Sequence, residues 1–247
     1  MDLLLTGKRA LVCGGSSGLG RAVATALVAE GVDVALLSRD AAALQAVADD
    51  LNAAGPGRAV IAPADMSDHA SLMAAVDVAE AALGGPIEIL LNNTGGPPPS
   101  GVAGLDPELW RAQFEAMVLS VFRLTDRVLP AMRDAGWGRI LNVASVSVIE
   151  PIGTLGVSNT LRAAITAWAK TLASEVAADG ITVNTLLPGR IDTPRIERLD
   201  AAAAERRGIS PAEARADSVA SIPVAGSARP RSSVPWPPFW RVRRRPM

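Results

Sequence analysis

The chain has 247 residues, of which 49% are hydrophobic, and its formal net charge at pH 7 is −1. This length and this apolar fraction are typical of one globular domain with a sizeable core. A charge near zero gives no overall attraction to nucleic acid or anionic lipid, and no apolar run approaches the roughly 18 residues that a membrane span needs. We therefore expect a small-molecule partner, with neither a membrane nor nucleic acid as its ligand.

Three further features bear on the compartment and on metals. Cys13 is the single cysteine, so an internal disulfide cannot form. Residues 1–5 lack a basic segment followed by a long apolar one, so we expect no secretory signal and a cytoplasmic protein. No His or Cys cluster has the spacing of metal ligands, and we expect no metal site.

Short apolar runs alternate along the chain with longer alanine-rich stretches of helical period. Strands are predicted at 8–13, 33–37, 58–62, 87–91, 138–143 and 181–186, and helices at 18–30, 41–54, 69–83, 107–134 and 158–179. This alternation is typical of repeated βαβ units with right-handed crossovers. It predicts an α/β fold of three layers, a Rossmann-type doubly wound parallel sheet between helices. Residues 201–204 are interpreted only as a short helix-forming run.

The composition changes near Pro223, after which proline and arginine dominate and neither Asp nor Glu occurs. Prolines at this density are incompatible with a central strand or a helix interior. We therefore predict a single domain over residues 1–222 and an atypical tail over 223–247.

A glycine-rich turn follows the first predicted strand and opens the first predicted helix. Glycines here permit positive φ and a close backbone approach, and the helix N-terminus offers free N–H groups to a phosphate. A glycine triplet alone is weak evidence for a nucleotide site. The residues predicted to form the phosphate cradle are Gly14, Ser16, Ser17, Gly18, Leu19 and Gly20.

Further motifs follow later strands: Asp65-Met66, Asn92-Asn93-Thr94-Gly95, and a loop from Pro188 to Thr193. With the glycine turn, they resemble the short-chain dehydrogenase/reductase family over residues 5 to 222, and 3-oxoacyl-carrier-protein-reductase-like members in particular. The resemblance implies a dinucleotide pocket with Asp65 and Met66 at the adenine. It also implies that other residues of these motifs contact the cofactor, namely Asn92, Gly95, Pro188, Gly189, Ile191 and Thr193.

The end of the second strand selects between the two nicotinamide dinucleotides. A carboxylate there would bond the ribose 2′-hydroxyl, whereas a cation would accommodate a 2′-phosphate. By family comparison Ser38 takes the discriminating position and Arg39 follows it, so we expect NADP(H) in preference to NAD(H). The alternative is that Arg39 is a solvated residue at a helix start that Asp40 caps.

The chain contains no tyrosine, although the family's reaction resembles general acid catalysis by a tyrosine with a lysine four residues later. Counting from the strand-end serine, Ser145, the pair is replaced by Ser158 and Arg162. Met117 stands where the family has a helical asparagine, and it can pack but cannot hold a proton-relay water. We assign Ser145, Ser158 and Arg162 to the catalytic site, with Arg162 also near the cofactor ribose; Ser145 could equally bond only loop backbone.

The resemblance implies an NADP(H)-dependent oxidoreductase for a carbonyl or alcohol substrate, with an unconventional proton-transfer site. The alternative is a catalytically inactive NADP(H)-binding sensor or partner subunit. A homodimer through the helices at 107–134 and 158–179 is a further expectation. Family members end in a helix and a seventh strand that the tail does not match, so we expect this last strand to be missing, either because the tail is out of frame or because it evolved as such.

Overall fold

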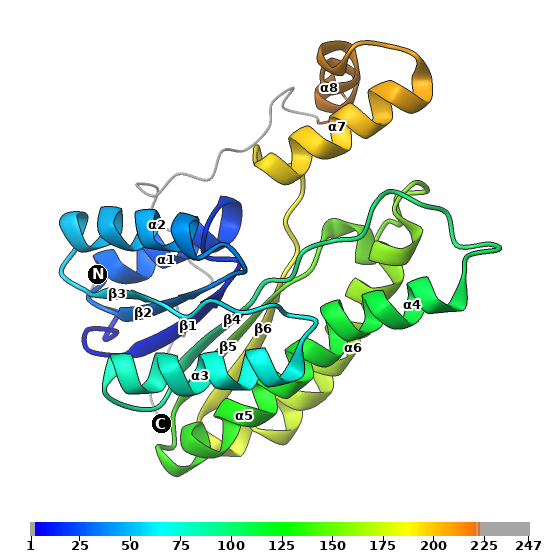
Figure 1. The fold of residues 1–247 in the computed structure, drawn as a ribbon. Helices are drawn as coiled ribbons and strands as arrows, with labels where there is room; N and C mark the ends of the chain where they lie inside the picture. The colour runs from blue at the N-terminus through cyan, green and yellow to red at the C-terminus, as the bar shows by residue number, and fades with distance from the viewer. Residues whose placement is uncertain (1–2, 221, 223–247) are drawn as a thin grey trace.

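The computed structural model of the protein describes residues 3–220 and 222. Within them, six parallel strands form one sheet in the order β3-β2-β1-β4-β5-β6 (Figure 1). This is the doubly wound Rossmann order, and it confirms the predicted fold class. The strands are β1 (Arg9–Cys13), β2 (Asp33–Leu37), β3 (Ala59–Ile61), β4 (Ile89–Asn92), β5 (Gly138–Val143) and β6 (Ile181–Leu186).

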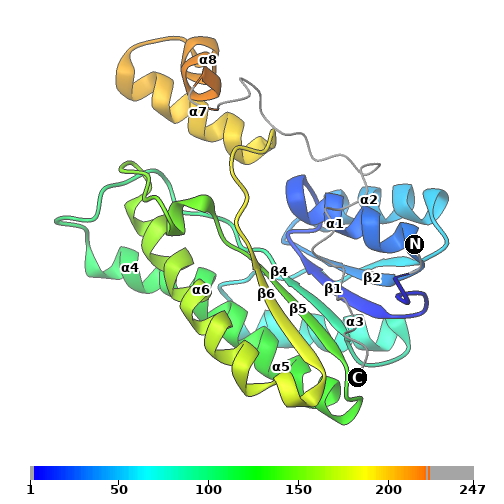
Figure 2. The same cartoon turned by 180° about the vertical axis from the view of Figure 1, so that it is seen from behind.

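Helices cover both faces of the sheet, with α1 and α2 on one face and α3, α5 and α6 on the other (Figures 1 and 2). A π-helical turn, Glu115–Leu119, joins α4 to α5. Short 3₁₀ turns lie at Val146–Val148 and Ala177–Asp179. The helices are α1 (Gly18–Ala29), α2 (Ala41–Ala54), α3 (His69–Leu83), α4 (Pro107–Phe114), α5 (Ser120–Asp134), α6 (Gly156–Glu175), α7 (Pro194–Arg207) and α8 (Pro211–Ala220).

Alternation along the strands gives the sheet two separate cores. On β1, Ala10 and Val12 pack with residues of α1 and α2, whereas Leu11 and Cys13 pack with residues of α3, α5 and α6. Because successive side chains of a strand point to opposite faces, a parallel sheet covered on both sides needs apolar residues at every position. This explains why β1 and β2 are continuous apolar runs.

The predicted strands and the first helices agree with the structure to within two residues at their ends. Asp106 caps α4 by accepting a hydrogen bond from the Glu108 amide at 2.9 Å, and Pro107 takes the first helical position. The chief difference lies beyond β6, where α7 and α8 form in a segment for which only a short helical run is predicted.

Helices α7 and α8 pack on each other beyond the carboxyl end of β6 (Figures 1 and 2). Two ion pairs tie them to the loop that leaves β6: Arg190 with Asp200, and Arg215 with Asp192 at 2.8 Å. The first pair is about nine-tenths buried on both sides. The helical pair is therefore anchored at its base, next to the strand ends.

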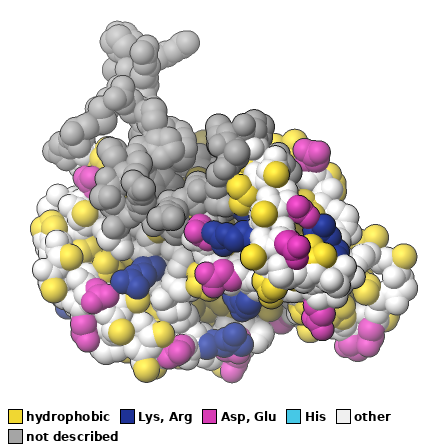
Figure 3. Space-filling model, turned by 90° about the horizontal axis from the view of Figure 1, so that it is seen from above, with side chains coloured by type: hydrophobic (Ala, Val, Ile, Leu, Met, Phe, Trp, Pro, Cys, Tyr) yellow, Lys and Arg dark blue, Asp and Glu magenta, His cyan; other side chains and the backbone are white. Residues whose placement is uncertain are grey.

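Viewed from above, acidic and basic side chains are intermixed over the visible part of this face (Figure 3). Among the residues described, no helix is both long enough and apolar enough to cross a membrane.

The predicted tail, 223–247, and the prediction of a missing last strand lie outside the described residues. The division into one domain and a tail stays a prediction.

Candidate active site

The candidate site lies along the carboxyl ends of the strands and is built from the loops that follow β1 to β6. The loops after β5 and β6 are joined directly, because the Val146 amide donates to the Pro188 carbonyl at 3.2 Å. The β6 loop also reaches the glycine turn, since the Thr193 methyl lies 3.4 Å from the place of a Cβ on Gly18. The Thr193 hydroxyl donates to the carbonyl of Ile191 at 3.2 Å. Predicted residues from opposite ends of the chain thus come together.

The glycine turn is tightly folded against the strand that precedes it. A Cβ on Gly20 would lie 2.1 Å from the Gly14 carbonyl oxygen, and Gly14 itself has a φ of +65°. No side chain caps the start of α1, so its first amides stay available to a ligand. Ser17 is the exposed N-cap residue and Ser16 is half-buried, while Leu19 packs against the core, which leaves its backbone for ligand contact. The turn fits a phosphate group.

Beside the turn, the ends of β2 and β3 supply polar groups. The Ser38 hydroxyl is buried and has no hydrogen-bond partner among the described residues, and Arg39 next to it is exposed. The amide and hydroxyl of Ser67 donate to the Asp65 carboxylate at 2.9 and 2.7 Å and lower the pKa of Asp65, with a smaller contribution from the charge of Arg39. Met66 packs half-buried on the core. An orphaned hydroxyl beside a solvent-facing cation fits a bound phosphate.

Asp40 accepts a hydrogen bond from the Ala43 amide at 2.9 Å and so caps α2. This part of the alternative interpretation of the segment is confirmed. Arg39 is exposed and its charge acts on Asp65, so both roles remain compatible with the geometry.

Asn92 is buried within the site and does not lie on its surface. Its amide nitrogen donates to the Asn142 side chain at 2.9 Å and to the Thr125 hydroxyl at 3.2 Å, which links β4 to β5 and α5. Asn92 is 2% exposed. Its contacts are those of a residue that sets strand geometry.

The loop after β4 carries two groups, on Asn93 and Thr94, that the sequence analysis quotes only as part of a motif and gives no role. Asn93 donates to the Cys13 carbonyl at 3.2 Å and so bridges β4 to the glycine turn. The Thr94 hydroxyl is buried and has no partner among the described residues. Gly95 and Gly189 have open space where a Cβ would stand. These glycines leave room along the cleft.

The three predicted catalytic residues lie at the end of β5 and the start of α6. Ser145 caps the 3₁₀ turn by accepting a hydrogen bond from the Ser147 amide at 3.1 Å. Arg162 donates from Nε to the Ser158 hydroxyl at 3.3 Å and from Nη1 to the Val143 carbonyl at 2.8 Å. Ser158 and Arg162 therefore form a connected pair, while Ser145 has the loop contact that was its alternative role.

Burial is the main cause that lowers the pKa of Arg162 to about 10, and the charge of Arg195 adds to it. A group with this pKa is still a cation near neutral pH, because protonation is favoured below the pKa. Arg162 therefore supplies a fixed positive charge beneath Ser158.

Met117 lies in the π-helical turn and is 2% exposed. It packs with residues of α5 and α6, including Val157 and Leu161, which confirms the packing role. In this turn the amide of Ser120 donates to the carbonyl of Glu115, five residues earlier. Such turns are frequent at functional sites. The long helix changes its hydrogen bonding next to the helix that carries Ser158.

Arg195 is a site residue that the sequence analysis does not predict. From the first turn of α7 it donates to the carbonyls of Gly96 and Pro97, at 3.2 and 2.9 Å. Burial and the neighbouring charge of Arg198 lower its pKa. Pro194 marks only the start of a helix, so no local pattern identifies Arg195 as a site residue.

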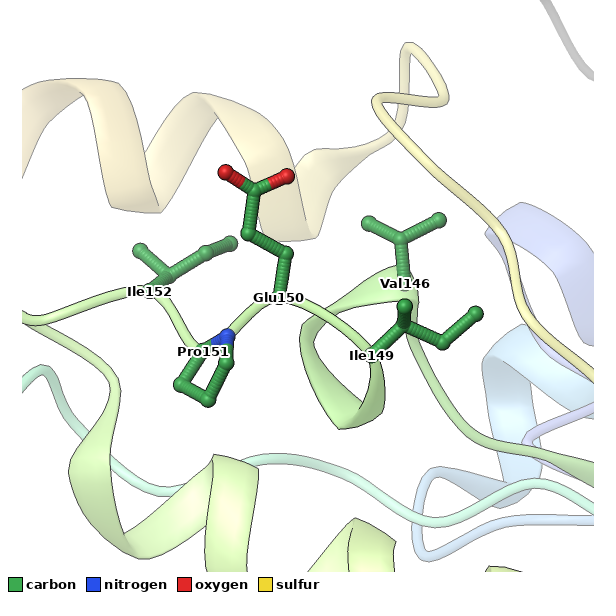
Figure 4. Close-up of a pocket in the computed structure, with 5 residues that line it drawn as sticks. All are labelled: Val146, Ile149, Glu150, Pro151 and Ile152. Atoms are coloured by element: carbon green, nitrogen blue, oxygen red, sulfur yellow. The ribbon is translucent and has the colours of Figure 1, made fainter.

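An open pocket of about 300 Å³ lies next to Ser145, along the loop that follows β5 (Figure 4). In Figure 4 the side chains of Val146 and Glu150 project from the same side of this loop. Ile149 is 77% exposed and Ile152 is 43% exposed, so the pocket presents an apolar surface with one carboxylate.

Comparison with known proteins agrees with this geometry. Residues 8–204 match the family model described as short chain dehydrogenase. The D-beta-hydroxybutyrate dehydrogenase of Cupriavidus necator is 33% identical over 218 residues, 87% of this chain and 83% of that protein. The 3-oxoacyl-[acyl-carrier-protein] reductase of Escherichia coli is 36% identical over 189 residues, 76% of this chain and 75% of that protein.

A solved structure gives the same result. The L-sorbose reductase of Gluconobacter frateurii, complexed with NADPH and L-sorbose, superposes with a TM-score of 0.85 and 30% identity, covering 93% of this chain and 88% of that one. The fold, the motifs at the strand ends and the relatives all agree, and the chain belongs to the short-chain dehydrogenase/reductase family of NAD(P)-dependent oxidoreductases.

Proposed function

We propose that the protein is a cytoplasmic NADP(H)-dependent oxidoreductase that interconverts a carbonyl and an alcohol through the pair Ser158 and Arg162. The observation that carries this proposal is the position of the Arg162 guanidinium, which bonds both the Ser158 hydroxyl and the end of β5. This arrangement places a buried cation behind a hydroxyl group at the strand ends. It supports a role for both residues at the reacting carbonyl.

Arg162 donates its Nε–H to Ser158, so the Ser158 hydroxyl keeps its own hydrogen for a substrate oxygen. The adjacent cation stabilises negative charge that develops on that oxygen. When bound, the reduced nicotinamide supplies the hydride. An aliphatic hydroxyl is far less acidic than a phenol, so we assign Ser158 the role of orienting the oxygen, with Ser145 as its second contact, and water the role of delivering the proton.

NADP(H) is the proposed cofactor because the Ser38 hydroxyl is buried without a partner in the described structure and Arg39 is exposed beside it. These groups suit a 2′-phosphate, which accepts hydrogen bonds and carries negative charge. NADPH is bound in the L-sorbose reductase and in the actinorhodin polyketide ketoreductase, whereas NAD is bound in a 3-oxoacyl reductase of Brucella melitensis.

The test is to titrate the purified protein with NADPH and NADH by fluorescence and then to add a panel of ketones and aldehydes. We expect tighter binding of NADPH, and turnover that falls at least about tenfold in Ser158→Ala because a hydrogen bond to the reacting oxygen is lost. Ser174→Ala is the matched control: it removes an exposed hydroxyl from the same helix, one that bonds only the Lys170 carbonyl.

Two outcomes would contradict the proposal. Turnover that is unaffected in Ser158→Ala would exclude the assigned role of this residue. Binding of NADPH without turnover of any carbonyl would favour the sensor or partner subunit instead.

We also propose a homodimer formed through α4, α5 and α6, the helices predicted at 107–134 and 158–179. Phe114 at the end of α4 is 39% exposed, which leaves an aromatic side chain for an interface. Sedimentation equilibrium of the protein and of Phe114→Glu is the test, and a monomeric wild type would exclude the dimer.

A further inference from the structure

Two arginines of the candidate site have only neutral partners. Arg162 bonds the Val143 carbonyl and the Ser158 hydroxyl, and Arg195 bonds the carbonyls of Gly96 and Pro97. No carboxylate of the described residues forms an ion pair with either one. Partly buried cations without a countercharge are costly to the folded state, because they lose hydration and gain no opposite charge in return. The site therefore lacks at least one negative charge that would balance the two arginines.

The backbone brings the segments that carry these arginines together. The Ser100 amide donates to the Thr154 carbonyl at 2.9 Å, and the Gly156 amide donates to the Ser100 carbonyl at 2.8 Å. Arg195 bonds the carbonyls of residues 96 and 97, and the loop that contains them therefore runs beside the start of α6. Ser158 and Arg162 lie in the first two turns of this helix. The charge of Arg195 is also one of the two causes that lower the pKa of Arg162.

Neighbouring acids do not compensate this charge. Asp192 and Asp200 lie close to Arg195 in sequence, but they pair with Arg215 and Arg190. Glu150 lies on the loop after β5, where it lines the open pocket and is exposed. Negative charge on a ligand would be repelled from Glu150 and attracted to the two arginines.

The pocket end has a different character. Val146, Ile149 and Ile152 are 40%, 77% and 43% exposed. Exposed apolar side chains grouped in one pocket mark a place where apolar ligand surface is buried. This pocket begins close to Arg162, because Arg162 bonds the Val143 carbonyl at the end of β5 and Val146 follows three residues later.

We propose that the substrate is an oxo acid, or the matching hydroxy acid, whose carboxylate binds between Arg162 and Arg195. Its carbonyl oxygen contacts Ser158, and its apolar chain lies along Val146, Ile149 and Ile152. This inference rests on the proposed oxidoreductase function and specifies its substrate class. It makes Arg195 a specificity-determining residue, which binds the substrate without taking part in hydride transfer.

The cofactor is a second source of negative charge, because its phosphates are anions as well. The phosphate cradle at Gly14–Gly20 lies at the end of β1, whereas Arg162 bonds the end of β5. This separation favours the substrate as the source at Arg162, whereas Arg195 lies two residues after Thr193, whose methyl meets Gly18 of the cradle. The experiment distinguishes the two sources by measuring them independently.

The test uses 3-oxohexanoate and its methyl ester, which share the carbonyl and the chain and differ in charge. Isothermal titration of each compound into the protein, with and without saturating NADP⁺, measures binding without turnover. We expect the acid to bind roughly tenfold to hundredfold more tightly than the ester, the effect of a charge-assisted hydrogen bond. Raising the salt concentration should weaken binding of the acid and leave the affinity for the ester unchanged.

Variants assign the preference to Arg195. Arg195→Met should reduce the ratio of acid to ester affinity about tenfold, because only the Arg162 cation remains, and Arg195→Lys should restore part of it because it keeps the charge. Arg206→Met is the matched control: it removes an exposed cation near the other end of α7, and the ratio should persist.

Three results separate the possibilities. Equal or undetectable binding of acid and ester by the wild type overturns the inference. An Arg195→Met variant that loses affinity for NADPH but keeps the acid preference also overturns it, because the anion is then a cofactor phosphate. An acid preference without any reduction of 3-oxohexanoate or other carbonyls by NADPH contradicts the proposed function and supports the anion site.

Discussion

The two ends of the candidate site use different groups: one presents backbone atoms and the other presents side chains. At the nucleotide end, the glycine turn presents backbone groups, and Gly20 is so close to Gly14 that no other residue fits. At the reaction end, Ser158 and Arg162 present side chains from a regular helix that many residues could occupy. Backbone geometry ties function to the fold, whereas side chains on α6 can change without changing it. This explains how the chain keeps the family's turn and lacks its tyrosine.

The strongest test of this comparison is to restore the family's pair in the variant Ser158→Tyr with Arg162→Lys. If only side chains differ at the reaction end, carbonyl reduction by NADPH should rise by about 10²- to 10⁴-fold, the usual contribution of a positioned acid. A steady-state assay on a ketone panel measures it.

Ser174→Tyr places the same ring on an exposed part of α6 and should leave the rate unchanged. Ser158 is buried, so the melting temperature and the affinity for NADPH are measured as well. A folded, NADPH-binding double variant with no gain in rate would mean that the two ends differ in more than these side chains.

The converse test disturbs the backbone at the nucleotide end with Gly20→Ala. The added methyl would stand 2.1 Å from the Gly14 oxygen and 2.6 Å from the Gly14 carbon, so backbone has to move. We expect a loss of about 3 kcal/mol in the free energy of unfolding and a fall of roughly 100-fold in the affinity for NADPH. Denaturant unfolding and fluorescence titration measure the two effects.

Gly153→Ala is the matched control, because a Cβ there meets no atom within 4 Å. It should change stability by less than about 0.5 kcal/mol. Tight binding of NADPH by Gly20→Ala would disprove the claim that this end depends on backbone geometry.

A smaller effect is expected where the nucleotide end does use a side chain. Arg39→Ala should weaken NADPH roughly tenfold, because one exposed cation facing a 2′-phosphate is lost. NADH has no 2′-phosphate and serves as the internal control, so its affinity should stay the same. An equal loss for both cofactors would place Arg39 outside the 2′-phosphate site.

Local patterns predict most of the fold, since apolar runs and helical periods locate the strands and the helices as far as β6. Helices α7 and α8 are missed although their ends carry ordinary signals. Gly208 ends α7 with a φ of +65°, and Ser210 and Glu213 exchange hydrogen bonds as a capping box at the start of α8. Only the run at 201–204 is predicted as helix-forming, because that prediction rests on composition and does not use these capping signals.

Other features of the site have no local signal. The π-helical turn around Met117 is a change of backbone hydrogen bonding that no residue type marks. The contact of Arg195 with Gly96 joins residues 99 positions apart and depends on how α7 docks. The pairing of Ser158 with Arg162 differs from these, because residues four apart lie on the same face of a helix and the sequence therefore predicts their contact.

The smallest effect is expected at Asp65, the carboxylate at the nucleotide end. Ser67 hydrogen bonds lower the pKa of Asp65 below 3.8, so the folded state favours the carboxylate. Folding then gains stability that is fully present above pH 3.8 and is lost as the pH falls through the lowered pKa. Asp65→Asn should destabilise the protein by less than about 1 kcal/mol at pH 7, since the site is partly exposed. Denaturant unfolding at pH 7 and pH 3 should show this difference shrinking in acid, and a difference independent of pH would show that Asp65 contributes by packing and not by charge.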